Sequence, residues 1–287
     1  MYCAMTPSHS PAPDSPRHRF FRHYAADPHF NMGFDEWMFR YCHQHAGTVL
    51  ARLYAWRVGT ITFGLNQRQR TAYDADRLGD TPVIRRATGG RAVYHDPSEV
   101  TYAIAVNPHD SPLKTLGGSV SATYARLADA LQLFLSRLGM VAEIVAGSQP
   151  QAARPEVFHK APCFASSARR ELVAEGRKII ASAQRQVDGV VLQHGSIKLA
   201  GLAAHPALGM IAAEASDADL QQIEDKEFDR LAGHFRASVE AGLGVRFDTG
   251  GVVSEEQTAI DAVVAWVRKN PLARRDPIKQ TTSAKSL

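Results

Sequence analysis

"RRATGGRAVYHD", residues 85–96, places two arginines before a Thr-Gly-Gly turn and a short alternating run. Gly89 and Gly90 permit positive φ angles and a close approach of the backbone to a ligand. Their N–H groups could therefore hold an oxyanion or a phosphate beside Arg85, Arg86 and Arg91. An ordinary turn flanked by solvated arginines explains the same residues equally well. The segment matches neither the phosphate-loop pattern nor the dinucleotide-binding GxGxxG pattern, so neither of those sites is indicated.

The segments on both sides of this turn have the composition and alternation of β-strands. Five segments show the pattern: residues 48–56, 59–64, 81–86, 92–96 and 99–106. The pattern predicts that the 85–96 segment lies in a loop between adjacent strands, with Gly89 and Gly90 outside any helix.

Helical periodicity is interspersed with these strands. The clearest helix is predicted over residues 119–139, where apolar side chains recur at intervals of 4-3-4-3-4 and the pattern closes on Gly139. A second helix is predicted over residues 31–45 with Asn31 as N-cap, and two more in the C-terminal part, the last with a capping box from Ser254 and Gln257. Further strand-like runs cover residues 19–24, 141–145, 171–176, 177–187 and 189–199. Together these elements predict an α+β fold in which a mixed β-sheet is flanked by helices.

The composition is that of a soluble globular protein, with 287 residues of which 45% are hydrophobic and 22% charged. We expect residues 1–19 to form a disordered lead, residues 20–270 a single domain with a helical C-terminal segment, and residues 271–287 a flexible tail. The net charge of +4 is spread without a block of like charges, so a nucleic-acid-binding arm is not predicted. The absence of a signal-peptide core and of an apolar run of ~18 residues predicts a cytoplasmic protein without a membrane span.

Three cysteines, Cys3, Cys42 and Cys163, lack the spacing of a disulfide framework or of zinc ligands. They predict a reducing compartment and no metal site. Cys163 lies in a long irregular segment where a nucleophile would be accessible, although a small core residue is the alternative interpretation. Lys178 lies in a small and apolar strand and could lower the pKa of a cysteine; an outward-facing strand lysine is the alternative.

The histidines of the sequence do not form a ligand set. No HxxxH or Cys/His spacing joins His95, His159 and His194. We therefore interpret them as structural histidines with hydrogen-bond partners, rather than as bases or metal ligands.

Four segments occur in order along the chain: FNMGFDEWMF, RRATGGRAVYHD, EGRKIIASAQ and VVLQHGSI. Their order and approximate spacing resemble the biotin/lipoate protein ligase superfamily, over most of the chain from Phe30 to about Leu199. Within it the chain is most similar to the cysteine-dependent octanoyltransferases of the LipM type. Cys163 precedes the Lys178 strand in a Cys-Phe context, and Arg91 stands where ATP-dependent ligases typically have a third glycine. The short C-terminal segment leaves little room for the accessory domain common in bacterial ligases.

This resemblance implies a biotin/lipoate ligase-like catalytic domain with acyltransferase activity. A Cys163 thiolate beside Lys178 would take an octanoyl group from acyl carrier protein and pass it to a lysine of a lipoyl domain or of the glycine cleavage H protein. No metal, nucleotide or other cofactor is implied, and neither a nucleic acid nor a membrane is an implied partner. The resemblance places ten residues at the substrate: Arg86, Thr88, Gly89, Gly90, Arg91, Ala92, Val93, His95, Ser182 and Ala183.

Two other functions remain open. An ATP-dependent lipoate-protein ligase would use ATP and Mg, with Lys178 contacting the lipoyl carboxylate and Cys163 incidental. A carrier-binding accessory subunit would keep the fold without the chemistry, and the presence of both Cys163 and Lys178 argues against it. Ala181 stands where the family usually has glycine, so the acyl chain-length preference does not follow from the resemblance.

Overall fold

The computed structural model describes residues 18–109, 113, 120–145, 171–174, 177–199, 203, 205–208, 221–248 and 251–274. Its helices and strands, in chain order, are β1 (His18–Ala26), α1 (Pro28–Gln44), β2 (Val49–Trp56), β3 (Thr60–Phe63), α2 (Gln69–Ala72), β4 (Val83–Arg85), β5 (Val93–His95), β6 (Val100–Val106), α3 (Val120–Arg137), β7 (Ala142–Val145), β8 (Glu171–Ala174), β9 (Arg177–Val187), β10 (Val190–Ile197), α4 (Asp225–Leu243) and α5 (Ser254–Lys269). Short 3-10 turns cover Ala75–Arg77 and Pro206–Leu208.

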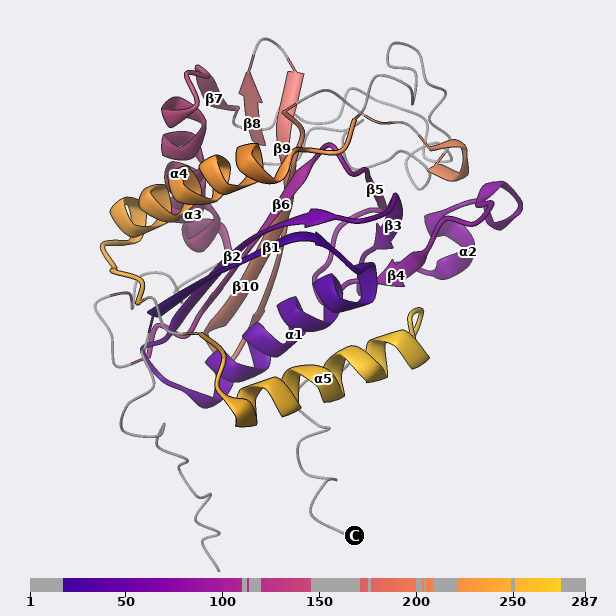
Figure 1. Ribbon diagram of the computed structural model, residues 1–287, viewed down its shortest axis with the longest axis horizontal. Coiled ribbons are helices and arrows are strands. Elements are labelled where there is room, and N and C mark those ends of the chain that lie inside the picture. The colour runs from indigo at the N-terminus through magenta and orange to yellow at the C-terminus, as the bar shows by residue number, and fades with distance from the viewer. Residues whose placement is uncertain are drawn as a thin grey trace, which may run out of the picture.

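Two β-sheets organise these elements. The main sheet has seven strands in the order β1-β2-β6-β10-β9-β8-β7, of which β1 and β2 pair in parallel and the other neighbours are antiparallel. The small sheet has the order β4-β3-β5. Helices α1 and α5 lie side by side on one face of the main sheet, and α3 and α4 cover the other face (Figure 1). The predicted α+β class, a mixed sheet flanked by helices, is confirmed.

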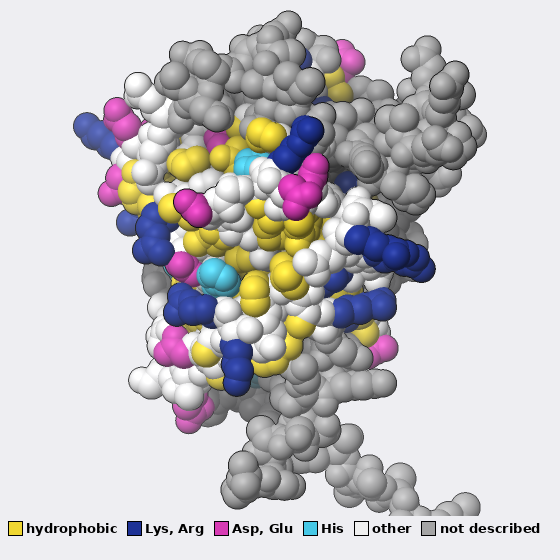
Figure 2. Space-filling model, turned by 90° about the vertical axis from the view of Figure 1, so that its right-hand side faces the viewer, with side chains coloured by type: hydrophobic (Ala, Val, Ile, Leu, Met, Phe, Trp, Pro, Cys, Tyr) yellow, Lys and Arg dark blue, Asp and Glu magenta, His cyan; other side chains and the backbone are white. Residues whose placement is uncertain are grey.

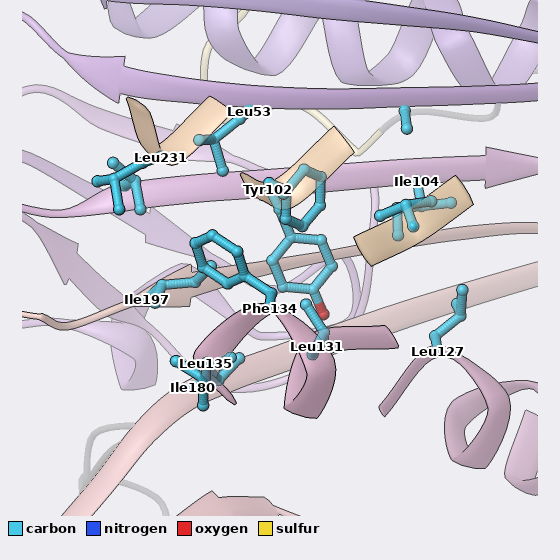
Figure 3. Close-up of a cluster of buried hydrophobic side chains, with 14 of the residues drawn as sticks. Leu53, Tyr102, Ile104, Leu127, Leu131, Phe134, Leu135, Ile180, Ile197 and Leu231 are labelled. Carbon is cyan, nitrogen blue, oxygen red and sulfur yellow. The ribbon is translucent and has the colours of Figure 1, made fainter. Parts of the chain in front are cut away.

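The core beneath α3 follows from the predicted helical periodicity. Leu127, Leu131 and Phe134 lie on one face of the helix because their spacing approximates 3.6 residues per turn. All three are buried against the sheet, where Tyr102 of β6 belongs to the same cluster (Figure 3). The helix stops as expected, since Gly139 follows it with a φ of +79°.

On the opposite face, α1 packs closely against α5. Gly33 of α1 makes this approach possible, because a side chain there would lie 2.9 Å from the Cα atom of Val264 in α5. Phe34, Trp37 and Met38 are buried between α1 and the sheet. The helix pair therefore holds α1 in a fixed position over the main sheet.

The start of α1 differs from the prediction. The helix begins at Pro28, and the carboxylate of Asp27 accepts hydrogen bonds from the N–H groups of His29 and Phe30. Asn31 is therefore not the N-cap, and that prediction was wrong. An Asp-Pro pair is the stronger start signal, because the aspartate caps the free N–H groups and proline suits the first turn.

The start of α5 also differs by one residue. The side chain of Glu256 accepts a hydrogen bond from the backbone N–H of Val253, so the capping box predicted from Ser254 and Gln257 was wrong. Glu256 additionally forms a buried two-point ion pair with Arg19 of β1, at 2.7 and 2.9 Å. The long-range ion pair fixes Glu256 at the helix start, and local sequence does not reveal it.

The Thr-Gly-Gly segment lies in the loop from β4 to β5, and Gly89 and Gly90 are outside any helix as predicted. The two strands are not adjacent, however, since β3 lies between them in the small sheet. That part of the prediction was wrong because β3, which precedes both in the sequence, pairs in parallel with β4 and antiparallel with β5.

Segments near both chain ends contact the rest of the fold. His18 and Arg19 pair with β2, and the carbonyls of Pro271 and Leu272 accept hydrogen bonds from Arg85. The division of the chain into lead, domain and tail remains a prediction. None of the helices within the described ranges is long and apolar enough to cross a membrane. Figure 2 shows hydrophobic side chains in the middle of one face, with separate basic and acidic side chains around them.

Candidate active site

A pocket lies where α1, the main sheet and the small sheet meet, with about 340 Å³ of empty space that includes open solvent. The residues that line it are Met32, Tyr54, Thr62, Arg86, Val93, His95, Thr101, Ala181, Ser182, Ala183, His194, Gly195 and Ser196.

Arg86 fixes the conformation of the glycine turn beside this cavity. Its Nε and Nη2 atoms donate to the Gly89 carbonyl at 3.0 and 2.6 Å, and Nη2 also donates to the Arg91 carbonyl at 2.7 Å. Its Nη1 atom donates to the carbonyl and hydroxyl oxygens of Thr62 at 3.2 and 3.4 Å. These contacts engage all five N–H groups of the guanidinium. Arg86 therefore holds the carbonyl groups of Gly89 and Arg91 close together.

The neighbouring segment 64–67 supports the turn from outside. Nη1 of Arg85 donates to the carbonyls of Gly64, Leu65 and Gln67, and the Leu65 N–H donates to the Thr88 carbonyl at 2.7 Å. A side chain at Gly64 would overlap the Gly90 carbonyl oxygen. The two segments can pack this closely only because position 64 is glycine.

The carbonyls of Thr88, Gly89 and Arg91 accept hydrogen bonds, whereas the N–H groups of the two glycines donate none to the described residues. Within the part of the chain that the structure describes, neither Gly89 nor Gly90 donates a backbone hydrogen bond. Gly90 has a φ of +87° and is exposed, and Gly89 is half-buried. The turn consequently offers two N–H donors to a carbonyl or anionic oxygen.

The buried carboxylate of Glu99 accepts several hydrogen bonds at another part of the cavity wall. Oε1 of Glu99 accepts hydrogen bonds from His95 Nδ1 at 2.7 Å, from Thr101 at 2.8 Å and from Ser196 at 2.6 Å. His95 Nε2 in turn accepts a hydrogen bond from the Thr62 hydroxyl at 2.8 Å, because Nδ1 carries the ring proton and donates its hydrogen bond to Glu99. The polar side chains of this wall are thus bonded to one another.

Neighbouring charges keep Glu99 and Lys198 of this wall ionised. Burial alone would raise the pKa of Glu99, but Lys198 and His95 lower it to about 2. Burial would likewise lower the pKa of Lys198, but Glu99 and Asp96 outweigh it and raise that pKa. Burial lowers the pKa of His95 despite the nearby Glu99, so its imidazole is neutral. Lys198 also donates to Asp96 at 2.6 Å and to the Tyr94 carbonyl at 3.1 Å.

His194 connects the loop to α1. Its Nε2 atom lies 2.6 Å from the Thr88 hydroxyl, and its Nδ1 atom lies 3.0 Å from Oδ2 of Asp35. Asp35 also accepts hydrogen bonds from the Tyr54 hydroxyl and from Arg52, both at 2.9 Å. Each polar side chain that lines the cavity therefore has a hydrogen-bond partner within the protein.

The structure brings five of the ten predicted substrate residues to the cavity: Arg86, Val93, His95, Ser182 and Ala183. Gly89 and Gly90 form the turn, Thr88 is buried behind it against His194, and Ala92 packs in the core of the small sheet, next to the half-buried Arg91.

Of the two predicted catalytic residues, the structure describes Lys178 but not Cys163. Lys178 lies on β9 opposite Val173 and is half-buried, and it is not among the described residues that line the cavity. Cys163 lies outside the described residues, as does His159. Cys42 is buried, and burial raises the pKa of its thiol far above the usual range. Among the described residues, no group of three or more His, Cys, Asp or Glu side chains could hold a metal ion.

Several cavity residues escaped the sequence analysis, among them Met32, Tyr54, Thr101 and Ser196. The alternation of residues 99–106 predicted a strand, but it could not show which face of that strand lies toward α1. His194 was predicted to be a structural histidine with hydrogen-bond partners, and both of its ring nitrogens have them.

Residues 27–217 match the model of the lipoyl protein ligase A/B catalytic domain. This match covers well over half of the chain. The chain belongs to this family.

Curated relatives in this family carry the name octanoyltransferase LipM. The chain is 36% identical to the protein from Macrococcus caseolyticus over 62% of this chain and 64% of the relative, and 38% identical to that from Moorella thermoacetica over 61% and 62%. These two alignments span less than two thirds of the relatives' length. The relative from Kyrpidia tusciae is 33% identical over 79% of this chain and 78% of its own length.

Solved structures with the same fold are lipoate-protein ligases. The chain superposes on a lipoate-protein ligase A bound with ATP with a TM-score of 0.61, at 16% identity, over 87% of this chain and 94% of that one. A bipartite lipoate protein ligase from Thermoplasma acidophilum gives a TM-score of 0.59 at 16% identity, over 90% and 99%. At this identity the likeness concerns the fold of the family.

Proposed function

We propose that this protein of the lipoyl ligase family is an octanoyltransferase. It moves an octanoyl group from an acyl carrier protein, through a thioester on Cys163, to a lysine of a lipoyl-carrier protein. The observation that carries the proposal is the cavity, whose polar side chains are already hydrogen-bonded within the protein. The names of the curated relatives support the same reaction.

The hydrogen bonding of the cavity favours an apolar acyl chain as its occupant. A ligand with its own polar groups, such as the ureido ring of biotin, would have to find donors on a wall where Thr62, Thr101 and Ser196 already donate elsewhere. Unpaired polar groups of this kind cost roughly 1–3 kcal/mol each. A hydrocarbon chain incurs no such cost and gains ~0.8 kcal/mol for each buried methylene.

The transfer proceeds in two steps at Cys163. The Cys163 thiolate attacks the carbonyl carbon of the octanoyl thioester, the bond to the carrier sulfur breaks, and the carrier leaves as a thiol after taking up a proton. The neutral lysine amine of the acceptor then attacks the new thioester, an amide forms as its nitrogen gives up a proton to solvent, and Cys163 is released as a thiolate. We assign to Lys178 the stabilisation of this thiolate, because a nearby ammonium lowers the pKa of a thiol.

The N–H groups of Gly89 and Gly90 suit a role at the carbonyl oxygen. Donors placed at a developing oxyanion contribute roughly 3 kcal/mol each in other enzymes. A side chain at Gly90 would lie 3.5 Å from Ala183 of β9, the strand that also carries Lys178.

The partners follow from this reaction. The donor is octanoyl-acyl carrier protein, and the acceptor is a lipoyl domain or the glycine cleavage H protein. One related structure is described as a lipoate protein ligase with its E2 lipoyl domain, which supports a lipoyl domain as acceptor. The proposed reaction needs no metal and no nucleotide, since both donor and intermediate are thioesters.

ATP-dependent lipoate ligation is the second candidate function, favoured by the fold shared with an ATP-bound lipoate-protein ligase A. The test mixes the purified protein with an apo lipoyl domain under two conditions, octanoyl-acyl carrier protein without ATP, or lipoic acid with ATP and Mg. Octanoylation of the domain in the first condition supports the transferase. Modification only in the second condition would establish the ligase instead.

A further inference from the structure

We infer that Asp35 and His194 are positioning residues that hold the glycine turn against the cavity through the hydroxyl of Thr88. This inference rests on the proposed function for its catalytic consequence, because the turn would bind the substrate carbonyl. The geometry itself depends on no substrate.

Three elements that are distant in sequence meet in this chain of contacts. Thr88 precedes the glycines of the loop, His194 lies on β10, and Asp35 lies on α1. The Thr88 hydroxyl and His194 Nε2 are 2.6 Å apart, and His194 Nδ1 and Asp35 Oδ2 are 3.0 Å apart. All three side chains are buried. A buried hydrogen bond of this kind is costly to break because its partners cannot turn to water.

Asp35 is a firm anchor for this chain. Its Oδ1 atom accepts from Arg52, whose guanidinium also donates to the carbonyl of Asn31, and its Oδ2 atom accepts from Tyr54. The carboxylate therefore has a fixed orientation. Asp35 accepts a hydrogen bond from Nδ1 of His194, and in the neutral imidazole this leaves Nε2 as the acceptor for the Thr88 hydroxyl.

The turn has few other attachments at Thr88. The backbone carbonyl of Thr88 binds the Leu65 N–H, and Arg86 binds the carbonyl of the following Gly89. Among the described residues, the hydrogen bond between Thr88 and His194 ties the turn to β10 of the main sheet. Thr88 thus links the turn to β10 and, through His194 and Asp35, to α1.

The isosteric substitution Thr88→Val, with Thr88→Ser as its control, tests the inference on the full chain without any ligand. Valine removes the hydroxyl and serine keeps it. We expect the backbone amides of Leu65 and Arg86 in Thr88→Val, which donate to the carbonyls of Thr88 and Phe63, to exchange with deuterium roughly tenfold faster, because breaking a buried hydrogen bond lowers the local opening free energy. Thr88→Ser should retain the protection of the parent. If Thr88→Val does not fold, Thr88→Ala replaces it.

The strands β2 and β10 serve as internal controls. Unchanged exchange in residues 49–56 and 190–197 supports a positioning role specific to the turn. No change at the Leu65 and Arg86 amides, or an equal increase in both strands, would overturn the inference.

A second readout connects the turn to catalysis. In the transfer assay, Thr88→Val should lower kcat roughly tenfold with a smaller change in KM, and Thr88→Ser should restore it. A parent protein that transfers no octanoyl group refutes the proposed function and leaves the exchange result standing. Faster exchange of the turn with unchanged kcat shows that the turn is held by Thr88 but contradicts its catalytic use.

Discussion

Replacing Ala181 by leucine should shorten the acyl chain that the protein accepts. Ala181 lies on β9, is 5% exposed and lines the cavity. Leucine adds three carbon atoms to the space that the acyl chain would fill. Each buried methylene contributes ~0.8 kcal/mol, so loss of three methylenes from an octanoyl chain removes about 2.4 kcal/mol, or about 60-fold in relative rate. Octanoyl transfer should fall by about this factor, and pentanoyl transfer should change little.

The assay measures acyl-enzyme formation from acyl carrier thioesters of five and eight carbons. Ala262→Leu, on the exposed side of α5, makes the same chemical change away from the cavity and should leave the ratio of the two rates unaltered. A thermal melt of each variant separates a loss of fold from a change in preference. If Ala181→Leu keeps the octanoyl-to-pentanoyl ratio of the parent, the acyl chain does not lie against β9.

Two further predictions concern the loop and the pH dependence. Gly64→Ala should disorder the turn and abolish transfer, because its side chain would overlap the Gly90 carbonyl. Gly89→Ala is the control, since its Cβ atom would meet no atom within 4 Å, and it should fold and melt like the parent. Equal behaviour of the two variants in melting and transfer would contradict the packing argument. Burial, and secondarily the charge of Arg52, lowers the pKa of His23 from 6.5 to about 2. The unfolded chain therefore binds this proton first, and the stability present above pH 6.5 is lost as the pH falls, by up to about 1.4 kcal/mol per pH unit from this group. Urea unfolding of His23→Asn between pH 6 and 4 should show a shallower decline, and a slope identical to that of the parent would exclude the role of His23.

Local patterns were sufficient for elements whose sequence signals are strong. The predicted strand of residues 177–187 and the structural strand β9 coincide, since the small and β-branched residues are bounded by a glycine on each side. The helix over α3 was predicted within two residues at each end, because its apolar spacing and Gly139 agree. The Thr-Gly-Gly loop was placed between two strands because alternation on both sides is visible without tertiary information.

Features that depend on contacts between distant segments were not predictable. The start of α5 was misplaced because the ion pair between Glu256 and Arg19 joins distant segments, whereas the N-cap of α1 was misplaced by choosing Asn31 over the local Asp27-Pro28 signal. The cavity requires Met32 of α1 and Ser196 of β10 to face the same space, which no single segment reveals. The two arginines of the loop looked like anion ligands, yet the structure directs their hydrogen bonds to backbone carbonyls. Cys163 and its distance from Lys178 remain predictions.

The most direct test of the central claim is the intact mass of the purified protein after mixing with octanoyl-acyl carrier protein without ATP. The account predicts one octanoyl adduct, located on Cys163 by peptide mapping, which disappears in Cys163→Ser and is transferred when an apo lipoyl domain is added. Cys42→Ser should retain the adduct, provided that the variant folds, because the Cys42 thiol is buried and its raised pKa keeps it protonated. An octanoylated lipoyl domain produced equally fast by Cys163→Ser, or produced only when ATP is present, would contradict the account.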